Sequence, residues 1–461
     1  MMSATRFNPA ILISDPQRRA RILPILDAAL DAVDPGAAVQ RMLTREGDLL
    51  RIAGRLWDLH TFQNVTVLSF GKAAVTMTGA LCELLGDRIS AGIALTKVGH
   101  AAGREQLPAS IAVLEAGHPV PDEAGVAASR RIAELAEQAA HDDLVICLVS
   151  GGGSALLTYP APGLSLADLQ ATTEALLRCG ATIDQINTLR KHLEVLKGGQ
   201  LARLVAPAKL ITLVLSDVVG SPLDVIASGP TVPDRSTWAD AWRVVENHSL
   251  TAVLPPAVID RLRAGLAGKI PDTPKTGDPS FADSRTVVVA DNALAAEAAA
   301  AAAQRGGFNS QVLTTFLEGE AREVARFAVA LAREVAVHQR PLAPPACLIL
   351  GGETTVTIHG QGKGGRNQEL ALAAALQLQS IAHGQRVVIV SLATDGSDGP
   401  TDAAGGMVDA GTVARGSAAG LHAADHLSNN DAYPFLAATD DLLLCGPTQT
   451  NVNDLIFVFV F

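Results

Sequence analysis

The sequence predicts an α/β protein with largely parallel sheets, because short β-branched runs alternate with longer helical stretches along the chain. Most of these runs are apolar on both faces, which is typical of strands that helices cover on both sides. The chain has 461 residues, about three times a typical domain, so we expect two or three domains with separate cores. The predicted strands are 65–70, 144–149, 210–215, 287–290, 346–350 and 387–392.

Composition and charge exclude several classes of protein. Hydrophobic residues make up 48% of the chain and charged residues 18%, which predicts compact folding rather than disorder. The formal net charge of −11 argues against broad binding to nucleic acid or to an anionic membrane surface. No stretch reaches the roughly 18 uninterrupted apolar residues of a membrane span, and residues 1–20 lack the layout of a secretory signal. We therefore expect a soluble, cytoplasmic protein.

Two consecutive helices are predicted near the middle of the chain. The first begins at Leu166, where Ser165 and Asp168 have capping-box spacing, and it ends near Gly180. The second helix has one apolar face and one polar face. Such a polar face is solvent-exposed in most proteins, and it becomes a ligand surface only if it faces a cleft. The apolar face consists of Ile186, Leu189, Leu193 and Leu196, and the polar face of Asn187, Arg190, Lys191, Glu194 and Lys197.

The clearest run of Gly, Pro and small polar residues lies between positions 262 and 284, and we interpret it as a connection between domains. The expected domains are therefore 1–270 and 285–461. After the connection, the Ala-rich segment 293–303 predicts a tightly packed helix. The terminal run LIFVFVF, 455–461, predicts a buried last strand.

Ligands of open α/β sheets bind beyond the carboxyl ends of the strands, so the residues that follow each run are the functional candidates. After 65–70 the chain turns through Gly71 into a helix that starts with Lys72. A cation in the first turn opposes the helix dipole, which suggests an anion shared by Lys72 and the helix N-terminus. Taken alone, this pattern is more often a solvated lysine than an anion site.

A run of three glycines, SGGGS at 150–154, follows the strand 144–149. Glycines let the backbone approach a ligand closely and aim N–H groups at phosphate or carboxylate oxygens. We therefore interpret the run as an anion cradle. The pattern is neither GxSxG nor GxxxxGK[ST], which disfavours a hydrolase elbow and a Walker A loop.

Carboxylates follow two further strands, and each has two open interpretations. Asp217 follows the strand 210–215. It either caps a turn, or it binds Mg²⁺ or polarises a hydroxyl group. Asp395, Asp398 and Asp402 follow the strand 387–392 and either form Asx turns or bind a metal beside a phosphate.

A second glycine-rich loop, 360–365, lies between a strand and a helix and contains GxGxxG. A dinucleotide site would need an acidic residue about 20 positions later, and none lies between Glu369 and Asp395. The loop instead presents Lys363 and Arg366 at a helix start, which suits the charge that develops on a transferring phosphoryl group.

Metal hydrolysis and covalent catalysis have little support in the sequence. There is no HExxH pattern, no cluster of His or Cys, and no order of Ser, His and Asp or of Cys, His and Asn that rises above chance. The five cysteines are scattered, which argues against disulfides and against a cysteine zinc site.

Taken in order, the motifs resemble the class II glycerate 2-kinase family, whose C-terminal part is the MOFRL domain. The resemblance covers almost the whole chain and extends to GPTQTNVNDL at 446–455, where Gln449 stands at a position that is usually Gly in the family. The motifs are FGKAA, SGGGSALL, INTLRKHLE, LKGGQLA, LSDV, GSPLDVIASGPT, GGETTVT, GKGGRNQE and TDGSDGPTDAAGG.

The resemblance implies a Rossmann-like N-terminal domain, a smaller α/β MOFRL domain and an active site in the cleft between them. It implies transfer of the γ-phosphoryl group of ATP to the 2-hydroxyl of D-glycerate, with Mg²⁺, giving 2-phosphoglycerate and ADP. Lys72 and Arg366 match the basic pair that such enzymes use in catalysis, and Arg190 is expected to bind the substrate carboxylate.

The expected site residues form four groups. The catalytic group is Lys72, Arg366 and Asp217, and the metal ligands are Asp217, Glu353 and Asp395. The expected substrate-binding residues are Ser150, Gly151, Gly152, Gly153, Ser154, Asn187 and Arg190. The expected nucleotide-binding residues are Gly352, Glu353, Lys363, Gly364, Asn367, Thr450 and Asn451.

Two other functions stay open at this point. Some relatives carry the name hydroxypyruvate reductase, which makes an NAD(P)H-dependent reductase the alternative, and the third is a catalytically silent protein that binds a sugar acid or a nucleotide. The expected partners are small molecules rather than nucleic acid or membrane, and a homodimer is the candidate assembly. The sequence does not distinguish phosphorylation at position 2 from position 3.

Overall fold

The computed structural model describes residues 5–8, 15–52 and 54–461. Its described residues divide into two compact units, 35–289 (the middle unit) and the residues up to 34 together with 290–461 (the terminal unit). These units differ from the ranges 1–270 and 285–461 expected from the sequence. The run between 262 and 284 lies inside the middle unit, because the strand that follows it joins that unit's sheet.

The middle unit is built on a six-stranded sheet in the order β6-β5-β4-β7-β8-β9. The strand pairs from β6 to β8 are all parallel, which confirms the parallel sheet expected here. Its elements are α2 (Pro35–Met42), β1 (Leu43–Glu46), β2 (Leu49–Ile52), β3 (Arg55–Asp58), β4 (Val65–Phe70), α3 (Ala74–Leu85), β5 (Ile89–Lys97), β6 (Ile111–Ala116), α4 (Glu123–Glu137), β7 (Leu144–Val149), α5 (Gly153–Leu156), α6 (Leu166–Arg178), α7 (Ile183–Leu193), α8 (Gln200–Val205), β8 (Lys209–Leu215), α9 (Trp238–Asn247), α10 (Pro256–Leu266) and β9 (Ser284–Ala290).

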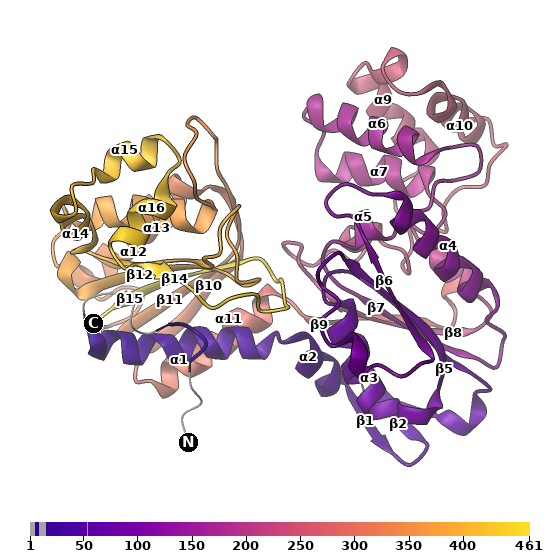
Figure 1. Ribbon diagram of the computed structural model, residues 1–461, viewed down its shortest axis with the longest axis horizontal. Coiled ribbons are helices and arrows are strands. Elements are labelled where there is room, and N and C mark those ends of the chain that lie inside the picture. Colours follow the sequence, from indigo (N-terminus) through magenta and orange to yellow (C-terminus); the bar gives the residue numbers. More distant parts are fainter. Residues whose placement is uncertain (1–4, 9–14, 53) are drawn as a thin grey trace. The chain divides into compact units, whose positions relative to one another are not determined.

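Two hydrophobic cores stabilise the middle unit. One lies between the sheet and the helices α4 and α8, and β4 and β7 are buried along their whole length. The other joins α6, α7, α9 and α10 into a helical layer of its own, which Figure 1 shows as a separate group of helices. The predicted capping box of α6 is present, since Ser165 and Asp168 bond each other's backbone N–H groups.

The terminal unit has a mixed sheet in the order β10-β11-β15-β12-β13-β14. Its elements are α1 (Pro16–Ala32), α11 (Asn292–Arg305), β10 (Asn309–Glu320), α12 (Ala321–His338), β11 (Ala346–Thr355), α13 (Arg366–Leu378), β12 (Val387–Ala393), β13 (Gly405–Asp409), α14 (Thr412–Ala418), α15 (Ala423–Ser428), α16 (Ala432–Ala438), β14 (Leu442–Leu443) and β15 (Asp454–Val460).

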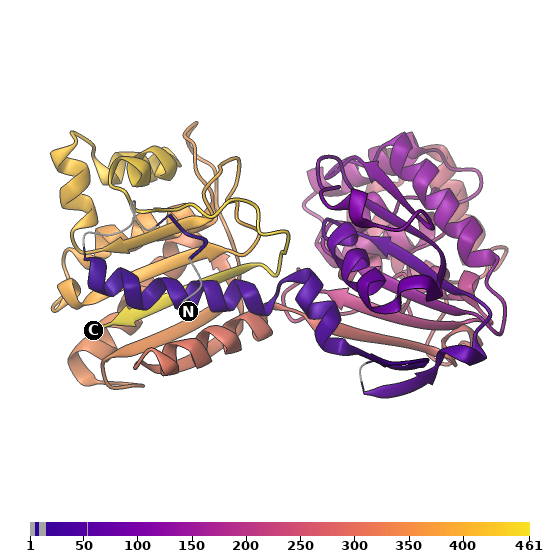
Figure 2. The same cartoon turned by 60° about the horizontal axis from the view of Figure 1, so that its bottom comes forward.

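A largely parallel sheet was the wrong expectation for the terminal unit. Only β10 and β11 pair in parallel, whereas β15 is antiparallel to both of its neighbours, β11 and β12. Apolar runs that are buried on both faces indicate a central strand but not its direction, so the sequence pattern could not distinguish the two cases. The predicted burial of the last strand is confirmed, and Figure 2 shows β15 inside the sheet.

Helices cover both faces of the terminal sheet. α12 and α13 pack on one face, α11 packs on the other, and α1 lies against α11, as Figures 1 and 2 both show. This packing explains why the first helix belongs to the terminal unit although it is at the start of the chain. None of the helices in the described residues combines the length and the apolarity that crossing a membrane requires.

Candidate active site

The glycine-rich turn after β7 lies directly against the turn after β4, because these two strands are parallel neighbours. Lys72 N donates to Gly151 O at 2.9 Å, and Ala73 N donates to Ser150 Oγ at 3.0 Å. Gly71 has a φ of +126°, and a Cβ there would lie 2.2 Å from Ser150 Oγ. The contact therefore requires glycine at this position, and it holds Lys72 beside the predicted anion cradle.

Two further side chains touch the cradle. A Cβ on Gly151 would lie 2.2 Å from Asp217 Oδ2, so the carboxylate of Asp217 rests against this glycine. Gly152 has a φ of +82°, and a Cβ there would lie 3.1 Å from the imidazole Nε2 of His118 and 3.4 Å from Lys72 Cγ. The structure thus brings together Lys72, Asp217 and the cradle, as the sequence predicted.

His118 is a site residue that the sequence analysis missed. It follows β6, a strand that the apolar pattern does not predict, so no strand end in the sequence points to His118. Burial, together with the positive charges of Lys72 and Lys97, lowers the pKa of the His118 imidazole to about 4. The imidazole is therefore neutral near pH 7 and can accept a hydrogen bond from a hydroxyl group beside the cationic Lys72.

Ser154 ends the cradle and takes part in a chain of hydrogen bonds. Its Oγ lies 3.0 Å from Ser228 Oγ, and Ser228 Oγ donates to Asn187 Oδ1 at 3.0 Å. Since the single hydroxyl proton of Ser228 is used on Asn187, Ser154 is the donor in the first bond. The acceptor lone pairs of Ser154 are then available to a hydroxyl group of a ligand.

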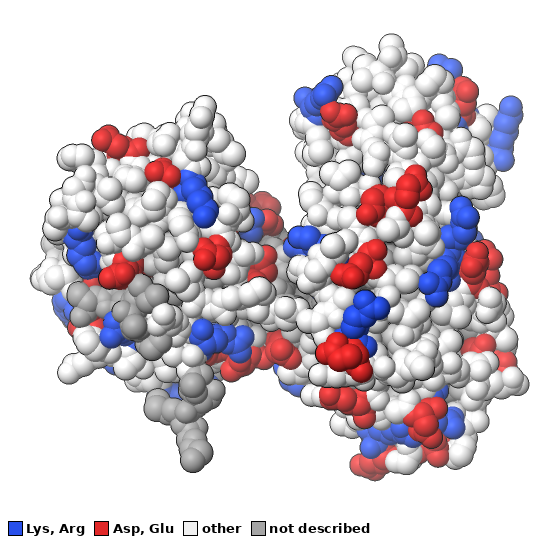
Figure 3. All heavy atoms as spheres, viewed as in Figure 1, with Lys and Arg blue, Asp and Glu red and all other residues white. Residues whose placement is uncertain are grey.

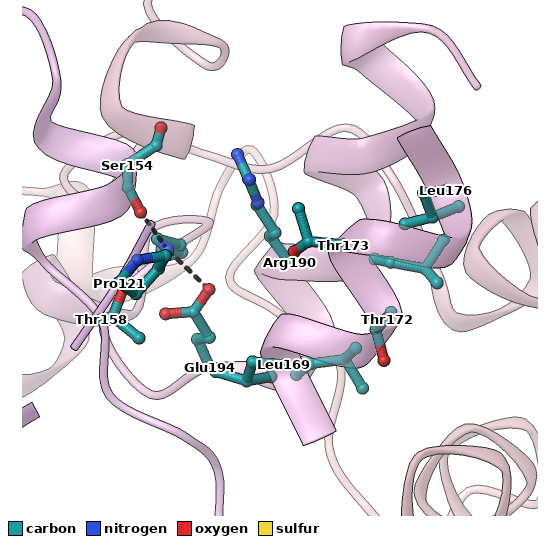
Figure 4. Close-up of a pocket in the computed structure, with 12 residues that line it drawn as sticks. Pro121, Ser154, Thr158, Leu169, Thr172, Thr173, Leu176, Arg190 and Glu194 are labelled. Atoms are coloured by element: carbon teal, nitrogen blue, oxygen red, sulfur yellow. Dashed lines mark hydrogen bonds and ion pairs between the residues drawn. The ribbon is translucent and has the colours of Figure 1, made fainter. Parts of the chain in front are cut away.

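A narrow pocket lies beside Ser154, and its cavity volume is about 20 Å³, room for roughly one water molecule. Figure 4 shows Arg190 standing in this pocket between Ser154 and Glu194 on one side and Thr173 on the other. Burial lowers the pKa of Arg190, and the negative charge of Glu194 opposes this effect. A half-buried guanidinium beside a small pocket is suited to a carboxylate.

The polar residues predicted on one helix face are not solvent-exposed, which corrects the simplest interpretation of the sequence pattern. The helix α7 also ends at Leu193, so Glu194 and Lys197 follow it rather than lie on it. Asn187, Lys191, Glu194 and Lys197 are buried. Lys191 pairs with Asp234 at 3.1 Å, and Lys197 pairs with Glu194 at 2.5 Å. The partners of these side chains come from within the fold, and of the two lysines it is Lys197 that also contacts the glycine turn, through Ser154.

Arg366 of the terminal unit is held by two carboxylates. Its Nη1 lies 2.6 Å from Glu353 Oε1, and its Nε and Nη2 contact the two carboxylate oxygens of Asp454. The sequence predicted Arg366 and Glu353 as site residues and missed Asp454, which is 88 positions away from Arg366 and had no local pattern to reveal it. These three contacts use three of the five N–H donors of the guanidinium.

The N-terminus of α13 already has an acceptor. Asp398 accepts hydrogen bonds from the backbone N–H groups of Asn367 at 3.2 Å and Gln368 at 2.8 Å. Gly365 makes this possible, since a Cβ there would lie 2.3 Å from Asp398 Cγ. Asp398 therefore occupies the position that the pyrophosphate takes in a dinucleotide-binding helix, which argues against the GxGxxG interpretation.

The remaining expected nucleotide residues have partners within the terminal unit. Lys363 Nζ lies 4.2 Å from the centre of the Tyr433 ring, and Gly364 follows it in the same loop. Asn367 is buried and accepts from Ser391 Oγ at 2.6 Å. Thr450 Oγ1 donates to Val33 O at 2.7 Å, and Asn451 Oδ1 accepts from Asn453 N at 3.1 Å.

The backbone conformation at positions 352 and 449 explains why glycine is required or usual there. Gly352 has a φ of +150°, and a Cβ there would lie 2.0 Å from Leu317 O, so glycine is required where β10 and β11 approach each other. Gln449 has a φ of +64°, in the left-handed region. This conformation explains why glycine is usual in the family at the position of Gln449.

The expected metal ligands lie on two units, Asp217 on the middle unit and Glu353 and Asp395 on the terminal unit. Asp395 Oδ1 accepts from Ser397 N at 3.1 Å, which is the Asx-turn alternative left open by the sequence. In the part of the chain that the structure describes, no group of three or more His, Cys, Asp or Glu residues could hold a metal ion. Their role as metal ligands stays a prediction.

Two family models match this chain. Residues 21–263 match the model of a domain of unknown function, DUF4147, and residues 346–454 match the MOFRL family. The fold and these two matches define a two-part α/β protein of the MOFRL class. The D-glycerate 2-kinase of Thermotoga maritima is 41% identical over 443 residues, which cover 96% of this chain and 98% of that protein.

A crystal structure titled glycerate kinase from Thermotoga maritima has a TM-score of 0.85 to this fold, with 40% identity over 97% of this chain and 100% of that one. The glycerate 2-kinase of Pyrococcus horikoshii is 39% identical over 95% of this chain and 96% of that protein. The chain belongs to the glycerate 2-kinase family, and the resemblance found in its motifs is confirmed.

Proposed function

We propose that this chain transfers the γ-phosphoryl group of ATP to the 2-hydroxyl of D-glycerate, giving 2-phospho-D-glycerate and ADP. The observation that carries the proposal is that Lys72, Asp217 and His118 surround the glycine turn 150–154, in a chain that is 41% identical to a D-glycerate 2-kinase over almost its whole length. A cation, a carboxylate and a neutral imidazole around a glycine-rich turn suit the binding of a small hydroxy acid and the transfer of a phosphoryl group to it.

The middle unit supplies the groups for the substrate. Arg190 is half-buried, lines the pocket beside Ser154 and is assigned to the carboxylate of D-glycerate. Ser154 accepts a hydrogen bond from a substrate hydroxyl, because its own proton is committed to Ser228. Asp217 and His118 are the candidates for orienting the 2-hydroxyl and accepting its proton.

Lys72 and Arg366 are assigned to the transferring phosphoryl group. Phosphoryl transfer passes through a loose transition state with negative charge spread over the peripheral oxygens, so fixed cations lower the barrier. Lys72 is held beside the glycine turn by its backbone bond to Gly151, and Arg366 is fixed by Asp454 and Glu353. The backbone of Lys72 and the guanidinium of Arg366 are thus positioned by their surroundings before the substrates bind.

Mg²⁺ is proposed as the companion of ATP. Mg²⁺ in kinases keeps several waters and takes one or two carboxylates together with substrate phosphates, so a protein needs no complete cage for it. Asp217, Glu353 and Asp395 offer single carboxylates of this kind, and all three are partly exposed. When bound, the ion would neutralise charge on the phosphate oxygens.

One assay separates this proposal from its alternatives. The protein is incubated with MgATP and D-glycerate, and separately with hydroxypyruvate and NADH or NADPH. ADP formation that requires D-glycerate supports the kinase. Consumption of NAD(P)H without ATP would identify a reductase instead, and ligand binding without either reaction would identify a silent binding protein.

A further inference from the structure

Lys197 is a fully buried cation that contacts the last residue of the glycine turn, Ser154. Its side chain is 1% exposed, and its Nζ donates to the carbonyl oxygen of Ser154 at 2.6 Å and to Glu194 Oε1 at 2.5 Å. Figure 4 marks both contacts with dashed lines beside the pocket. The other oxygen of Glu194 accepts from Tyr159 N at 3.3 Å, so the carboxylate itself is anchored to the chain.

The segment that carries Lys197 is held firmly. Gln200 Nε2 donates to the carbonyl oxygens of Lys191, Glu194 and Lys197, at 3.0, 2.7 and 3.0 Å. Gly198 N also donates to Ser228 O at 2.9 Å. The same short segment therefore supports both Ser154 and Ser228, the two hydroxyl residues of the hydrogen-bond chain beside the pocket.

A buried ion pair is a poor way to stabilise a fold. Taking two charges out of water offsets most of their attraction, and apolar residues of the same size often stabilise a core at least as well. Burial lowers the pKa of Lys197 to about 8, against the opposing effect of Glu194 and with a further contribution from the nearby Arg190. The ammonium is retained near pH 7 and can donate to Ser154 and Glu194 together.

We propose that Lys197 is a positioning residue of the kinase, which holds the carbonyl of Ser154 so that the hydroxyl of Ser154 and the guanidinium of Arg190 face the same D-glycerate molecule. Ser154 is then fixed at two points, by Lys197 at its carbonyl and by Ser228 at its hydroxyl. This inference rests on the proposed function, since it names the support of the substrate-binding half of that site.

The test compares two buried lysines of the same region. In Lys197→Met the ammonium is lost beside the glycine turn. In the matched control, Lys191→Met, an ammonium of similar burial is lost from its pair with Asp234, which does not touch Ser154. Both variants lose a buried ion pair, so they should be destabilised alike, and both are assayed at a temperature where circular dichroism shows them folded.

Loss of a charge-assisted hydrogen bond predicts that Lys197→Met raises the KM for D-glycerate about tenfold or more, with the KM for ATP within about twofold of wild type. Lys191→Met should leave both values near wild type. A D-glycerate KM that is unchanged in folded Lys197→Met, or raised equally in both variants, would overturn the proposal.

Hydrogen exchange separates this inference from the proposed function. Amides of residues 150–156 should exchange faster in Lys197→Met and at the wild-type rate in Lys191→Met, and this readout needs no turnover. If the wild type does not phosphorylate D-glycerate, the proposed function fails, and the exchange rates alone decide whether Lys197 holds the turn. Unchanged exchange in Lys197→Met contradicts the inference whatever the activity.

Discussion

Arg366 and Asp454 form a two-point ion pair in which Nε lies 2.5 Å from Oδ2 and Nη2 lies 3.1 Å from Oδ1. Asp454 is 3% exposed, so the pair fixes the plane of the guanidinium from the buried side. Burial lowers the pKa of Arg366, but Asp454 and Glu353 together raise that pKa above its usual value. The charge of Arg366 is therefore permanent, and its direction is set by a residue far along the chain.

The variant Asp454→Asn tests whether Asp454 positions the guanidinium of Arg366. The amide keeps the size of the side chain but loses the charge and one of the acceptors, so Arg366 should lose its fixed orientation. We expect kcat to fall by about 10–100-fold, the effect of losing a charged hydrogen-bond partner, with a smaller change in the KM for D-glycerate. Steady-state kinetics measure both, and a kcat near wild type in a folded variant would show that Asp454 does not position Arg366 for catalysis.

Lys72→Ala and Arg366→Ala should each lower kcat by about 10²–10³, the scale of removing one preorganised stabiliser of transition-state charge. Folding should be retained, although Arg366→Ala leaves the buried Asp454 without its counter-charge and should be less stable than Lys72→Ala. Lys209→Ala is the control, since Lys209 starts β8 at the end of the strand opposite to Asp217 and pairs with Asp283. The assignment fails if circular dichroism shows native folding while turnover stays near that of the control.

We predict that glycine is required at position 152 for activity as well as for the conformation of the turn. Gly152→Ala and Gly163→Ala both place a Cβ on a left-handed backbone, with φ of +82° and +88°, at a cost of about 1–2 kcal/mol. The Cβ at 152 would press on His118 and Lys72, whereas nothing lies within 4 Å of the one at 163. Both variants should lose similar thermal stability.

Only Gly152→Ala should also lose kcat/KM, by about tenfold or more, because a small displacement of catalytic groups is costly. Parallel melting curves and kinetics separate the two effects. Equal kcat/KM values in the two variants would mean that the turn tolerates a side chain facing His118 and Lys72.

The contrast between His118 and Lys72 shows how far the sequence could predict this site. Lys72, Asp217 and the glycine turn each follow a strand that is recognisable from its apolar run, so a local pattern located them. His118 follows β6, whose middle residues are only half-buried, and the strand gave no comparable signal. Asp454 and Lys197 act through partners 88 and 43 positions away, and such pairing is created only by the tertiary fold.

The same reasoning explains which parts of the fold were predicted correctly from the sequence and which were not. Strands β4 and β7 were predicted at their observed bounds because both faces are buried. The direction of β15 and the unit to which α1 belongs depend on how distant segments pack, and the hydrophobic pattern alone does not determine this packing.

Acidic and basic residues are interspersed on the surface. Figure 3 shows both kinds of charge on the drawn face of each unit, in keeping with the expectation of small-molecule ligands.

Asp398 should make stability depend on pH in a defined direction. Burial raises the pKa of this carboxyl from 3.8 to about 6, although the N–H groups of Gln368 and Asn367 oppose the shift. Because the folded pKa is the higher one, the contribution of Asp398 to stability is fully present below about pH 3.8 and is lost as the pH rises through about 6.

Asp398→Asn removes this titration while keeping an oxygen that can accept from the start of α13. Relative to wild type, the variant should therefore become more stable by on the order of 1 kcal/mol between about pH 4 and pH 7. Thermal melts of both proteins across this range measure the difference. A difference that stays constant with pH would show that Asp398 does not titrate between these values.

Phosphorus NMR of the reaction tests the central claim most directly. With MgATP and D-glycerate, we predict that the γ-phosphate signal of ATP declines while a phosphomonoester signal appears, split into a doublet by the single proton on carbon 2. A triplet, from the two protons on carbon 3, would contradict the proposed position of transfer. The absence of any glycerate-dependent ester would contradict the kinase itself.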